Sequence, residues 1–163
     1  MTAAVPIVRL HHAMLYVREL DRSVTFYRDL FGFQEVAREG GVVSLLRIPG
    51  SPNQHDLALL ALGEAAPRPV RGSTGLYHLA WEVASIEDLA AAAQQLSAIR
   101  ALTGASDHGA TKSLYGRDPD GIDFEVTWMV PRPFWGEWER RGVVRPLDLD
   151  AELRRWGRPV ARA

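Results

Sequence analysis

Two histidines and one glutamate are the residues of this chain best suited to bind a metal ion. Glu125 lies between Phe124 and Val126, in an apolar run where a carboxylate needs a cation, a hydrogen-bond network or a metal as its partner. His12 and His78 each stand at the start of another apolar run, and imidazole is a common metal ligand. Because the chain contains no cysteine, any metal must be held by histidine and carboxylate.

The turn before Glu125 predicts the hairpin that positions it. The sequence Asp-Pro-Asp-Gly at residues 118–121 combines a proline, which presets the turn backbone, with a glycine, which accepts a positive φ angle. Tyr115 lies just before this turn, and Glu125 lies in the apolar run after it. We therefore expect a β-hairpin with the tyrosine on one strand and the carboxylate on the next, and with His108 further upstream in the same stretch.

The first half of the chain predicts elements in the order βαβββ. Alternation in the first run places His12, Met14 and Tyr16 on one face of a strand. Asp21 is the expected N-cap of the helix that follows, and Gly32 is the expected C-cap. The predicted strands cover residues 10–17, 33–38, 42–48 and 55–62, and the helix ends at Leu30.

The second half predicts the same order of elements after a linker. Residues 63–75 are rich in glycine, proline and arginine, and we interpret them as a linker on the surface. Ser85 is the expected N-cap of the second helix, with Asp88 three residues on as its capping-box partner. The remaining elements are strands at residues 76–83 and 99–102, followed by the hairpin.

The two halves form an internal repeat. His12-Ala-Met-Leu-Tyr-Val aligns with His78-Leu-Ala-Trp-Glu-Val, so the two histidines occupy equivalent positions. The repeat argues for one domain over residues 8–130, built from modules at about residues 8–62 and 76–130. If the modules curl around a shared cleft, the two imidazoles and Glu125 meet there.

Such a set of ligands has a known chemistry. Two histidines and one carboxylate, without thiolate, form the facial triad of non-haem Fe(II) sites, which leaves coordination positions open. A lone histidine at the start of a strand is more often satisfied or exposed than bound to metal. Equivalent histidines in a repeat, together with a carboxylate in an apolar strand, favour the ligand role. His11 is the alternative ligand in the first module, and the repeat favours His12.

Composition gives no sign of a nucleic-acid or membrane partner. The 163 residues carry a formal net charge of −1, and no apolar run has the length of a membrane span. No signal peptide is visible, so we expect a cytoplasmic protein. The tail, residues 131–163, begins with several aromatic residues and predicts a short helix at 147–156, which suggests packing on its own domain or on a second subunit.

The sequence resembles the vicinal oxygen chelate superfamily, which groups glyoxalase I, bleomycin-resistance proteins, epimerases and extradiol dioxygenases. The matching residues are His12–Val17, Leu20–Ser23, Phe26–Tyr27, Leu30–Phe33, His78–Val83, Asp118–Gly121 and Phe124–Glu125. The resemblance implies an α+β fold, with two tandem βαβββ modules forming one curved mixed-sheet domain with a metal-holding cleft. It also implies that His12, His78 and Glu125 are the metal ligands, and that the protein is a homodimer.

Within the superfamily, the sequence is most similar to single-domain type I extradiol dioxygenases. These enzymes carry a histidine before an apolar strand, an Asp-His-Gly turn and a tyrosine before the Asp-Pro-Asp-Gly turn, and this chain has His55, His108 and Tyr115 in those places. Glyoxalase I and the epimerases use a fourth ligand, Glu or Gln, from the last strand of the first module, and residues 57–62 contain neither. The resemblance therefore implies an Fe(II) enzyme, with Mn(II) also suited to the ligands, that cleaves a small aromatic diol with dioxygen.

The same resemblance implies catalytic roles for His55, His108 and Tyr115. His55 would donate and accept protons near neutral pH, while His108 and Tyr115 would hydrogen-bond the substrate oxygens. Each also has an ordinary structural explanation: His55 as a solvated loop histidine, Tyr115 as a half-buried core tyrosine, and His108 as a turn residue stabilised by Asp107.

Two other functions stay open at the level of the sequence. One is a glyoxalase- or epimerase-like lyase or isomerase that depends on a metal. The other is a non-catalytic protein of the resistance type, which binds a small molecule such as an antibiotic. Many extradiol enzymes carry two domains of this kind, whereas residues 8–130 account for one.

Overall fold

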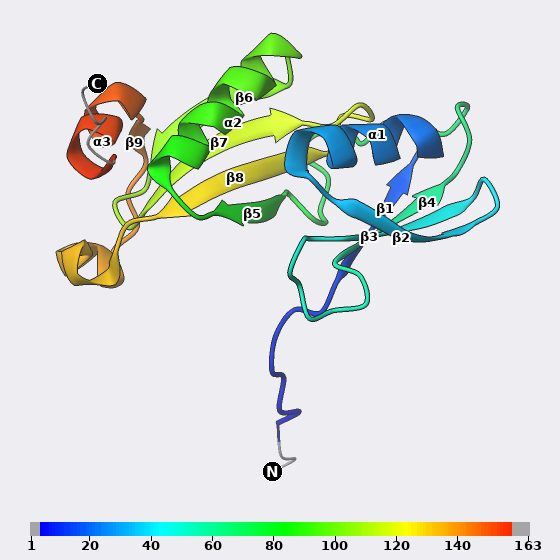
Figure 1. Ribbon diagram of the computed structural model, residues 1–163, viewed down its shortest axis with the longest axis horizontal. Helices are drawn as coiled ribbons and strands as arrows, with labels where there is room; N and C mark the ends of the chain where they lie inside the picture. Colours follow the sequence, from blue (N-terminus) through cyan, green and yellow to red (C-terminus); the bar gives the residue numbers. More distant parts are fainter. Residues whose placement is uncertain (1–3, 158–163) are drawn as a thin grey trace, which may run out of the picture. The chain divides into compact units, whose positions relative to one another are not determined.

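The computed structural model describes residues 4–157 and divides into two compact units, with the boundary between Arg68 and Pro69. Unit 1 contains the first βαβββ module, and unit 2 contains the second module and the tail. Each unit has one mixed sheet with a helix on one face (Figure 1). Residues 158–163, the end of the predicted tail, lie outside the described residues.

Unit 1 is built on a four-stranded sheet. Its elements are β1 (Ala13–Val17), α1 (Leu20–Phe31), β2 (Gln34–Glu39), β3 (Val43–Arg47) and β4 (Leu57–Ala61). The strand order is β1-β4-β3-β2, in which β1 is parallel to β4 and the other neighbours are antiparallel. Alternate apolar residues of β1 and β4 are buried together with one side of α1. The buried residues include Leu15, Val17, Val24, Tyr27, Leu57 and Leu59.

The start of α1 corrects the predicted N-cap. The cap residue is Glu19, because its carboxylate accepts hydrogen bonds from the backbone N–H groups of Asp21 and Arg22, at 3.2 and 2.7 Å. The helix begins earlier than expected because Leu20 is apolar and buried, which leaves Asp21 inside the first turn. At the other end, Gly32 has a φ of 71° and confirms the predicted C-cap.

Unit 2 repeats this plan and adds the tail. Its elements are β5 (Leu79–Val83), α2 (Ile86–Ala98), β6 (Leu102–Asp107), β7 (Thr111–Arg117), β8 (Asp123–Met129), β9 (Arg145–Pro146) and α3 (Leu149–Trp156). The strand order is β5-β8-β7-β6-β9, with β5 parallel to β8. Ser85 caps α2 as predicted. The strand expected at residues 99–102 instead begins at Leu102, because Ile99 and Arg100 complete the end of the helix.

The predicted hairpin is confirmed as the pair β7 and β8. Its turn is held by Asp118, whose buried carboxylate accepts hydrogen bonds from the backbone N–H groups of Asp120 and Ile122, each at 2.9 Å. The resulting register places Tyr115 directly opposite Glu125. The turn therefore fixes which side chains of the two strands become neighbours.

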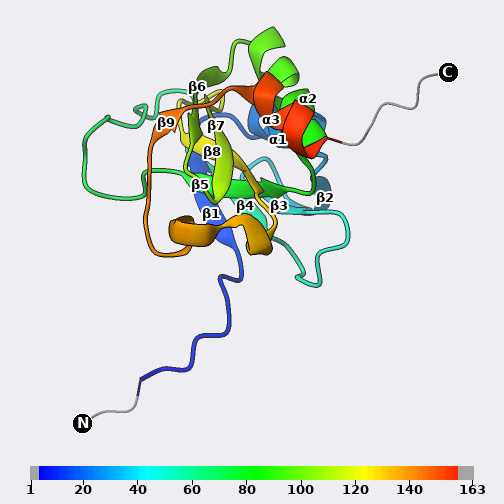
Figure 2. The same cartoon turned by 90° about the vertical axis from the view of Figure 1, so that its left-hand side faces the viewer.

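The tail returns to the body of unit 2. Two short 3-10 helices, Arg132–Phe134 and Gly136–Glu139, follow β8, and β9 then pairs with the outer strand β6. The last helix, α3, lies beside α2 (Figures 1 and 2). The ring of Trp156 on α3 lies 6.0 Å from Trp128 and 4.9 Å from Phe134, measured between ring centroids.

The two modules share one construction, as the repeat predicted. His12 and His78 each immediately precede the first strand of their module, and that strand is parallel to the module's last strand. The α+β class and the pair of βαβββ modules are confirmed, with the strands in two sheets, one in each unit.

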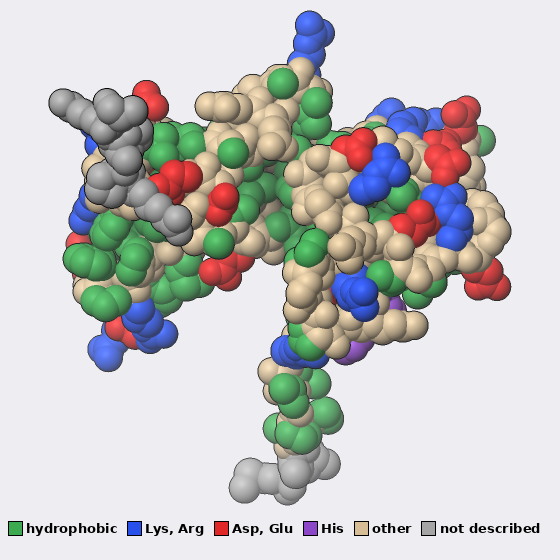
Figure 3. Space-filling model, viewed as in Figure 1, with side chains coloured by type: hydrophobic (Ala, Val, Ile, Leu, Met, Phe, Trp, Pro, Cys, Tyr) green, Lys and Arg blue, Asp and Glu red, His purple; other side chains and the backbone are tan. Residues whose placement is uncertain are grey.

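Surface features agree with the composition. Charged side chains of both signs are mixed over the face shown in Figure 3, consistent with a formal net charge of −1. Within residues 4–157, no helix is both long enough and apolar enough to cross a membrane.

Candidate active site

Glu125 and His78 meet on one face of the unit 2 sheet. Phe124 and Val126 are buried on the opposite face, so alternation along β8 turns Glu125 away from the core. His78 precedes the neighbouring strand β5, and its Nε2 lies 2.9 Å from Oε2 of Glu125. The side chains are only 24% and 13% exposed. The carboxylate that needed a partner therefore has one in this histidine.

The geometry of this pair suits two neighbouring ligands of one metal ion. Two atoms each about 2.1 Å from an ion, at right angles, lie about 3 Å apart, close to the observed separation. Nδ1 of His78 is buried and has no hydrogen-bond partner in the described part of the chain. Among residues 4–157, no group of three or more His, Asp or Glu side chains able to hold a metal lies within either unit. Unit 2 thus supplies two of the predicted donors, and His12 belongs to unit 1.

A tyrosine and a histidine form a second pair beside Glu125. Nε2 of His108 lies 2.7 Å from the hydroxyl of Tyr115, and Nδ1 of the same ring lies 2.8 Å from the backbone carbonyl of Val143. Burial raises the pKa of Tyr115, and the negative charge of Glu125 raises it further. Tyr115 is therefore a neutral phenol at physiological pH.

A pocket in unit 2 opens beside these residues. It has a volume of about 390 Å³, and its lining includes His78, Tyr115 and Tyr77. Arg71, from the linker, also lines it. The pocket therefore combines aromatic walls with a cation and with one of the two candidate metal donors of unit 2.

Unit 1 holds the other predicted histidines in a cluster. The ring centroids of His12 and His55 are 4.5 Å apart, and Nδ1 of His11 lies 2.9 Å from Nδ1 of His12. Nδ1 of His55 is buried without a hydrogen-bond partner in the described residues. Burial lowers the pKa of His55, and the neighbouring histidines lower it further, against the opposing charge of Asp56.

Polar contacts in the loop before β4 hold this cluster in place. Asn53 donates hydrogen bonds to the backbone carbonyl of His11, at 2.8 Å, and to Asp56, at 2.7 Å. Asp56 also accepts from the hydroxyl of Ser51 at 2.7 Å. These contacts connect the segment that carries His12 to the loop that carries His55.

Register identifies the position in unit 1 that corresponds to Glu125. In unit 2, Glu125 pairs with the second residue after His78. In unit 1, Ala58 pairs with the second residue after His12. Ala58 is 2% exposed and carries no side-chain donor atom. The first module therefore lacks a carboxylate at the position equivalent to Glu125.

Comparison with known proteins identifies the family. Residues 9–126 match the family model described as the Glyoxalase/Bleomycin resistance protein/Dioxygenase superfamily. The chain belongs to this superfamily. A solved member, the glyoxylase/bleomycin resistance protein/dioxygenase domain from Frankia sp. EAN1pec, shares the fold with a TM-score of 0.66 at 23% identity, over 77% of this chain and 95% of that one.

Two similar proteins are named as dioxygenases. The chain is 31% identical to the catechol-2,3-dioxygenase of Bacillus subtilis (strain 168), over 93% of this chain and 53% of the relative. It is 30% identical to the manganese-dependent 2,3-dihydroxybiphenyl 1,2-dioxygenase of Geobacillus genomosp. 3, over 78% of this chain and 38% of the relative. The chain thus spans about half or less of the length of these curated relatives.

The superfamily residues predicted from the sequence fall into one group in each unit. His78, Glu125, Tyr115 and His108 lie together in unit 2, and His12 lies against His55 in unit 1. Their roles as ligands and catalysts stay predictions.

Sequence reasoning missed two participants around His108. The carbonyl of Val143 belongs to the backbone, so the pattern of side chains could not predict its contact with His108. The burial of Lys112 had a signal in the sequence. Alternation along β7 puts Ser113 and Tyr115 on one face and Lys112 on the other, core-facing side with Leu114.

Proposed function

We propose that this superfamily member is an Fe(II)-dependent extradiol dioxygenase that opens the ring of a catechol-type aromatic with dioxygen. The observation that carries the proposal is the arrangement around Glu125. A nitrogen of His78 lies 2.9 Å from its carboxylate, and the residue opposite it, Tyr115, is hydrogen-bonded to His108. The two relatives named as dioxygenases of catechol and dihydroxybiphenyl support this reaction class.

His12, His78 and Glu125 would hold the metal ion. Two imidazoles and one carboxylate suit Fe(II) in sites with open positions, and the absence of a carboxylate at Ala58 keeps the ligand number at three. The ion would supply Lewis-acid and one-electron chemistry between the diol and dioxygen. Mn(II) suits the same ligands, and one relative is named as manganese-dependent.

The remaining residues would bind the substrate and move protons. The pocket of about 390 Å³ is large enough for a single aromatic ring with small substituents, and its aromatic walls favour a planar ligand. Tyr115, which lines this pocket, would hydrogen-bond a substrate oxygen while His108 orients the phenol. His55 would exchange protons with the substrate, since its ring lies against that of the proposed ligand His12.

A direct assay separates this proposal from its alternatives. Metal-free protein is loaded anaerobically with Fe(II) or Mn(II) and mixed with catechol, 3-methylcatechol or 2,3-dihydroxybiphenyl in air. Ring opening appears as a yellow product with stoichiometric uptake of oxygen. Conversion of a glutathione hemithioacetal with Ni(II) or Zn(II), without oxygen uptake, identifies a lyase instead. Tight binding of an aromatic ligand without turnover under any metal identifies a binding protein.

A further inference from the structure

His108 is fixed through both nitrogens of its ring. Because a carbonyl oxygen only accepts hydrogen bonds, Nδ1 must carry the proton that it donates to Val143, at 2.8 Å. In the neutral ring, Nε2 is then an acceptor, and the hydroxyl of Tyr115 donates to it at 2.7 Å. The phenol oxygen of Tyr115 also takes part in a hydrogen bond with the side chain of Ser106, and its remaining lone pair can accept from a donor outside, such as the hydroxyl of a diol.

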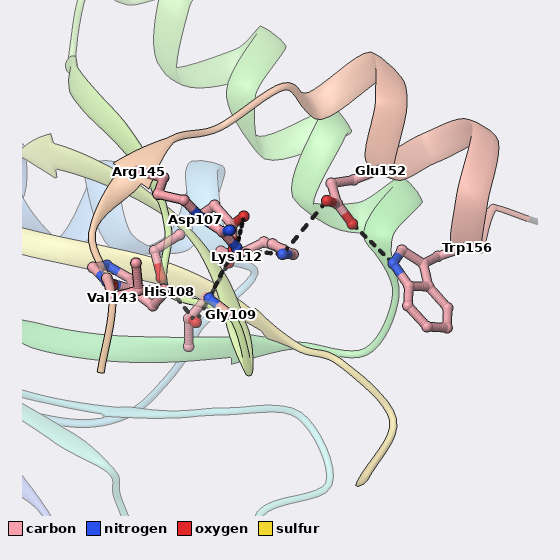
Figure 4. Close-up of polar contacts among 10 residues, drawn as sticks. Asp107, His108, Gly109, Lys112, Val143, Arg145, Glu152 and Trp156 are labelled. Atoms are coloured by element: carbon pink, nitrogen blue, oxygen red, sulfur yellow. Dashed lines mark hydrogen bonds and ion pairs between the residues drawn. The ribbon is translucent and has the colours of Figure 1, made fainter. Parts of the chain in front are cut away.

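The carbonyl of Val143 is brought to His108 by strand β9. In the antiparallel pair of β9 and β6, Arg145 lies opposite Asp107, and its guanidinium contacts the Asp107 carboxylate at 2.9 Å. The other oxygen of this carboxylate accepts from the backbone N–H of Gly109, at 2.7 Å. The carboxylate of Asp107 therefore joins the turn that carries His108 to the tail that carries Val143, the hydrogen-bond partner of His108 (Figure 4).

A buried lysine extends this connection to α3. Lys112 has a side chain only 5% exposed, and its Nζ contacts Asp107 at 2.5 Å and Glu152 at 3.4 Å. Glu152 also accepts from the indole N–H of Trp156, at 2.8 Å (Figure 4). Because a buried ammonium needs nearby carboxylates, removing either partner leaves a charge that destabilises this arrangement. The tail is thus held at two points, to Asp107 at the end of β6 and to Lys112 on β7.

The turn itself is shaped to receive the tail. Gly109 has a φ of 79°, and a Cβ placed there would lie 2.5 Å from Cγ of Trp138. Only glycine allows this approach. The guanidinium of Arg145 lies over the ring of Trp138, 5.1 Å from the ring centroid.

We propose that the tail segment Val143–Trp156 is a positioning element for the Tyr115–His108 pair. Held by Arg145, Asp107 and Lys112, it presents the carbonyl of Val143 and thereby selects the Nδ1–H tautomer of His108. The tautomer makes Tyr115 an acceptor toward the substrate. The catalytic consequence rests on the proposed dioxygenase function, whereas the tautomer is a property of the protein without metal or substrate.

Nitrogen NMR of the metal-free 163-residue chain tests the tautomer directly. With 15N-labelled histidine at about pH 8, above the ordinary histidine range, His108 should appear as a single Nδ1–H tautomer. In Arg145→Ala the tautomers should mix, and Arg145→Lys should restore the single form. Arg141→Ala is the matched control, because this tail arginine pairs only with Glu137 among the contacts seen, at 2.8 Å. An Nε2–H tautomer in the wild type, or an unchanged His108 in Arg145→Ala with an intact fold by circular dichroism, overturns the proposal.

Kinetics then test the catalytic consequence. In the metal-loaded enzyme, Arg145→Ala should lower kcat about fivefold to tenfold, as expected for one misplaced hydrogen bond, with metal content and KM little changed. Arg145→Lys should recover most of the loss, and Arg141→Ala should resemble the wild type. A loss confined to KM or metal content contradicts a positioning role. If no ring cleavage occurs in any variant, the proposed function fails, while the NMR result still decides the role of the tail.

Discussion

Tyr115 on β7 lies directly opposite Glu125 on β8. Direct neighbours on one sheet face have Cβ atoms about 4.5–5.5 Å apart, so a ligand bound by the carboxylate comes within reach of the phenol. The effect of the carboxylate is already visible in the raised pKa of Tyr115, to which burial contributes most and Glu125 next. The hairpin therefore couples a candidate metal ligand to a candidate substrate contact through backbone register alone.

Glu125→Gln should weaken metal binding strongly. The amide keeps the shape of the side chain but removes the negative charge, and loss of even an outer-shell partner costs about 10-fold to 100-fold in affinity. Anaerobic titration with Fe(II), followed by metal analysis, measures the change. Asp123→Asn is the matched control, because Asp123 lies on the same strand and face but pairs with Arg117, at 2.9 Å. Equal metal affinity in the two variants would argue against Glu125 as a ligand.

The contacts of Asp107 predict an acid-sensitive tail. Burial alone would raise the pKa of Asp107, yet Lys112, the Gly109 N–H and Arg145 together hold it below its usual value. Since the pKa is lower in the folded state, these contacts stabilise the protein fully above the unfolded value of about 3.9, and the stabilisation is lost as pH falls below it.

Thermal melts from pH 7 to pH 3 measure this effect. The wild type should be more stable than Asp107→Asn at neutral pH, and the difference should shrink below about pH 4. Tryptophan fluorescence follows the tail, because Trp156 lies against Trp128. A difference that does not change with pH would mean that the variant acts through packing alone.

Local chemistry explains how much of this structure was predictable from the sequence. Pro119 and Gly121 specify a turn by their own backbone preferences, so the hairpin and the register of Glu125 followed from short-range information. Glu19 was missed as a helix cap because glutamate is not a usual cap residue. Contacts that join distant segments, such as Val143 with His108, are set by the path of the tail. No local pattern encodes that path.

His55→Ala should slow turnover without loss of metal. Its ring lies against His12, with centroids 4.5 Å apart, but the proposed ligand role belongs to His12. Removing a general acid–base typically lowers the rate about 10²-fold to 10⁴-fold. Single-turnover ring cleavage, normalised to bound iron, measures the effect, and His12→Ala provides the contrast because it should lose the metal itself. Parallel loss of iron and rate in His55→Ala would contradict the assigned role.

Arg71 predicts a preference for substrates with an anionic substituent. It lines the pocket beside His78 and Tyr115, and it forms no hydrogen bond or ion pair with another described residue, whereas the other lining arginine, Arg117, is paired with Asp123. A carboxylate on the ring of a catechol would therefore meet an uncompensated guanidinium. Because Arg71 is exposed, the gain is modest, about twofold to fivefold in affinity.

The comparison that tests this preference pairs a catechol carrying a carboxylate with its neutral methyl counterpart. In the wild type, KM should be lower for the carboxylated ring, and raising the salt concentration should reduce the advantage because exposed charges are screened. Arg71→Ala should raise KM for the carboxylated substrate alone. Arg140→Ala, which removes an exposed tail arginine that does not line the pocket, should leave both KM values as they are. If Arg71→Ala changes KM equally for both substrates, the arginine shapes the pocket and does not recognise the negative charge of the substrate.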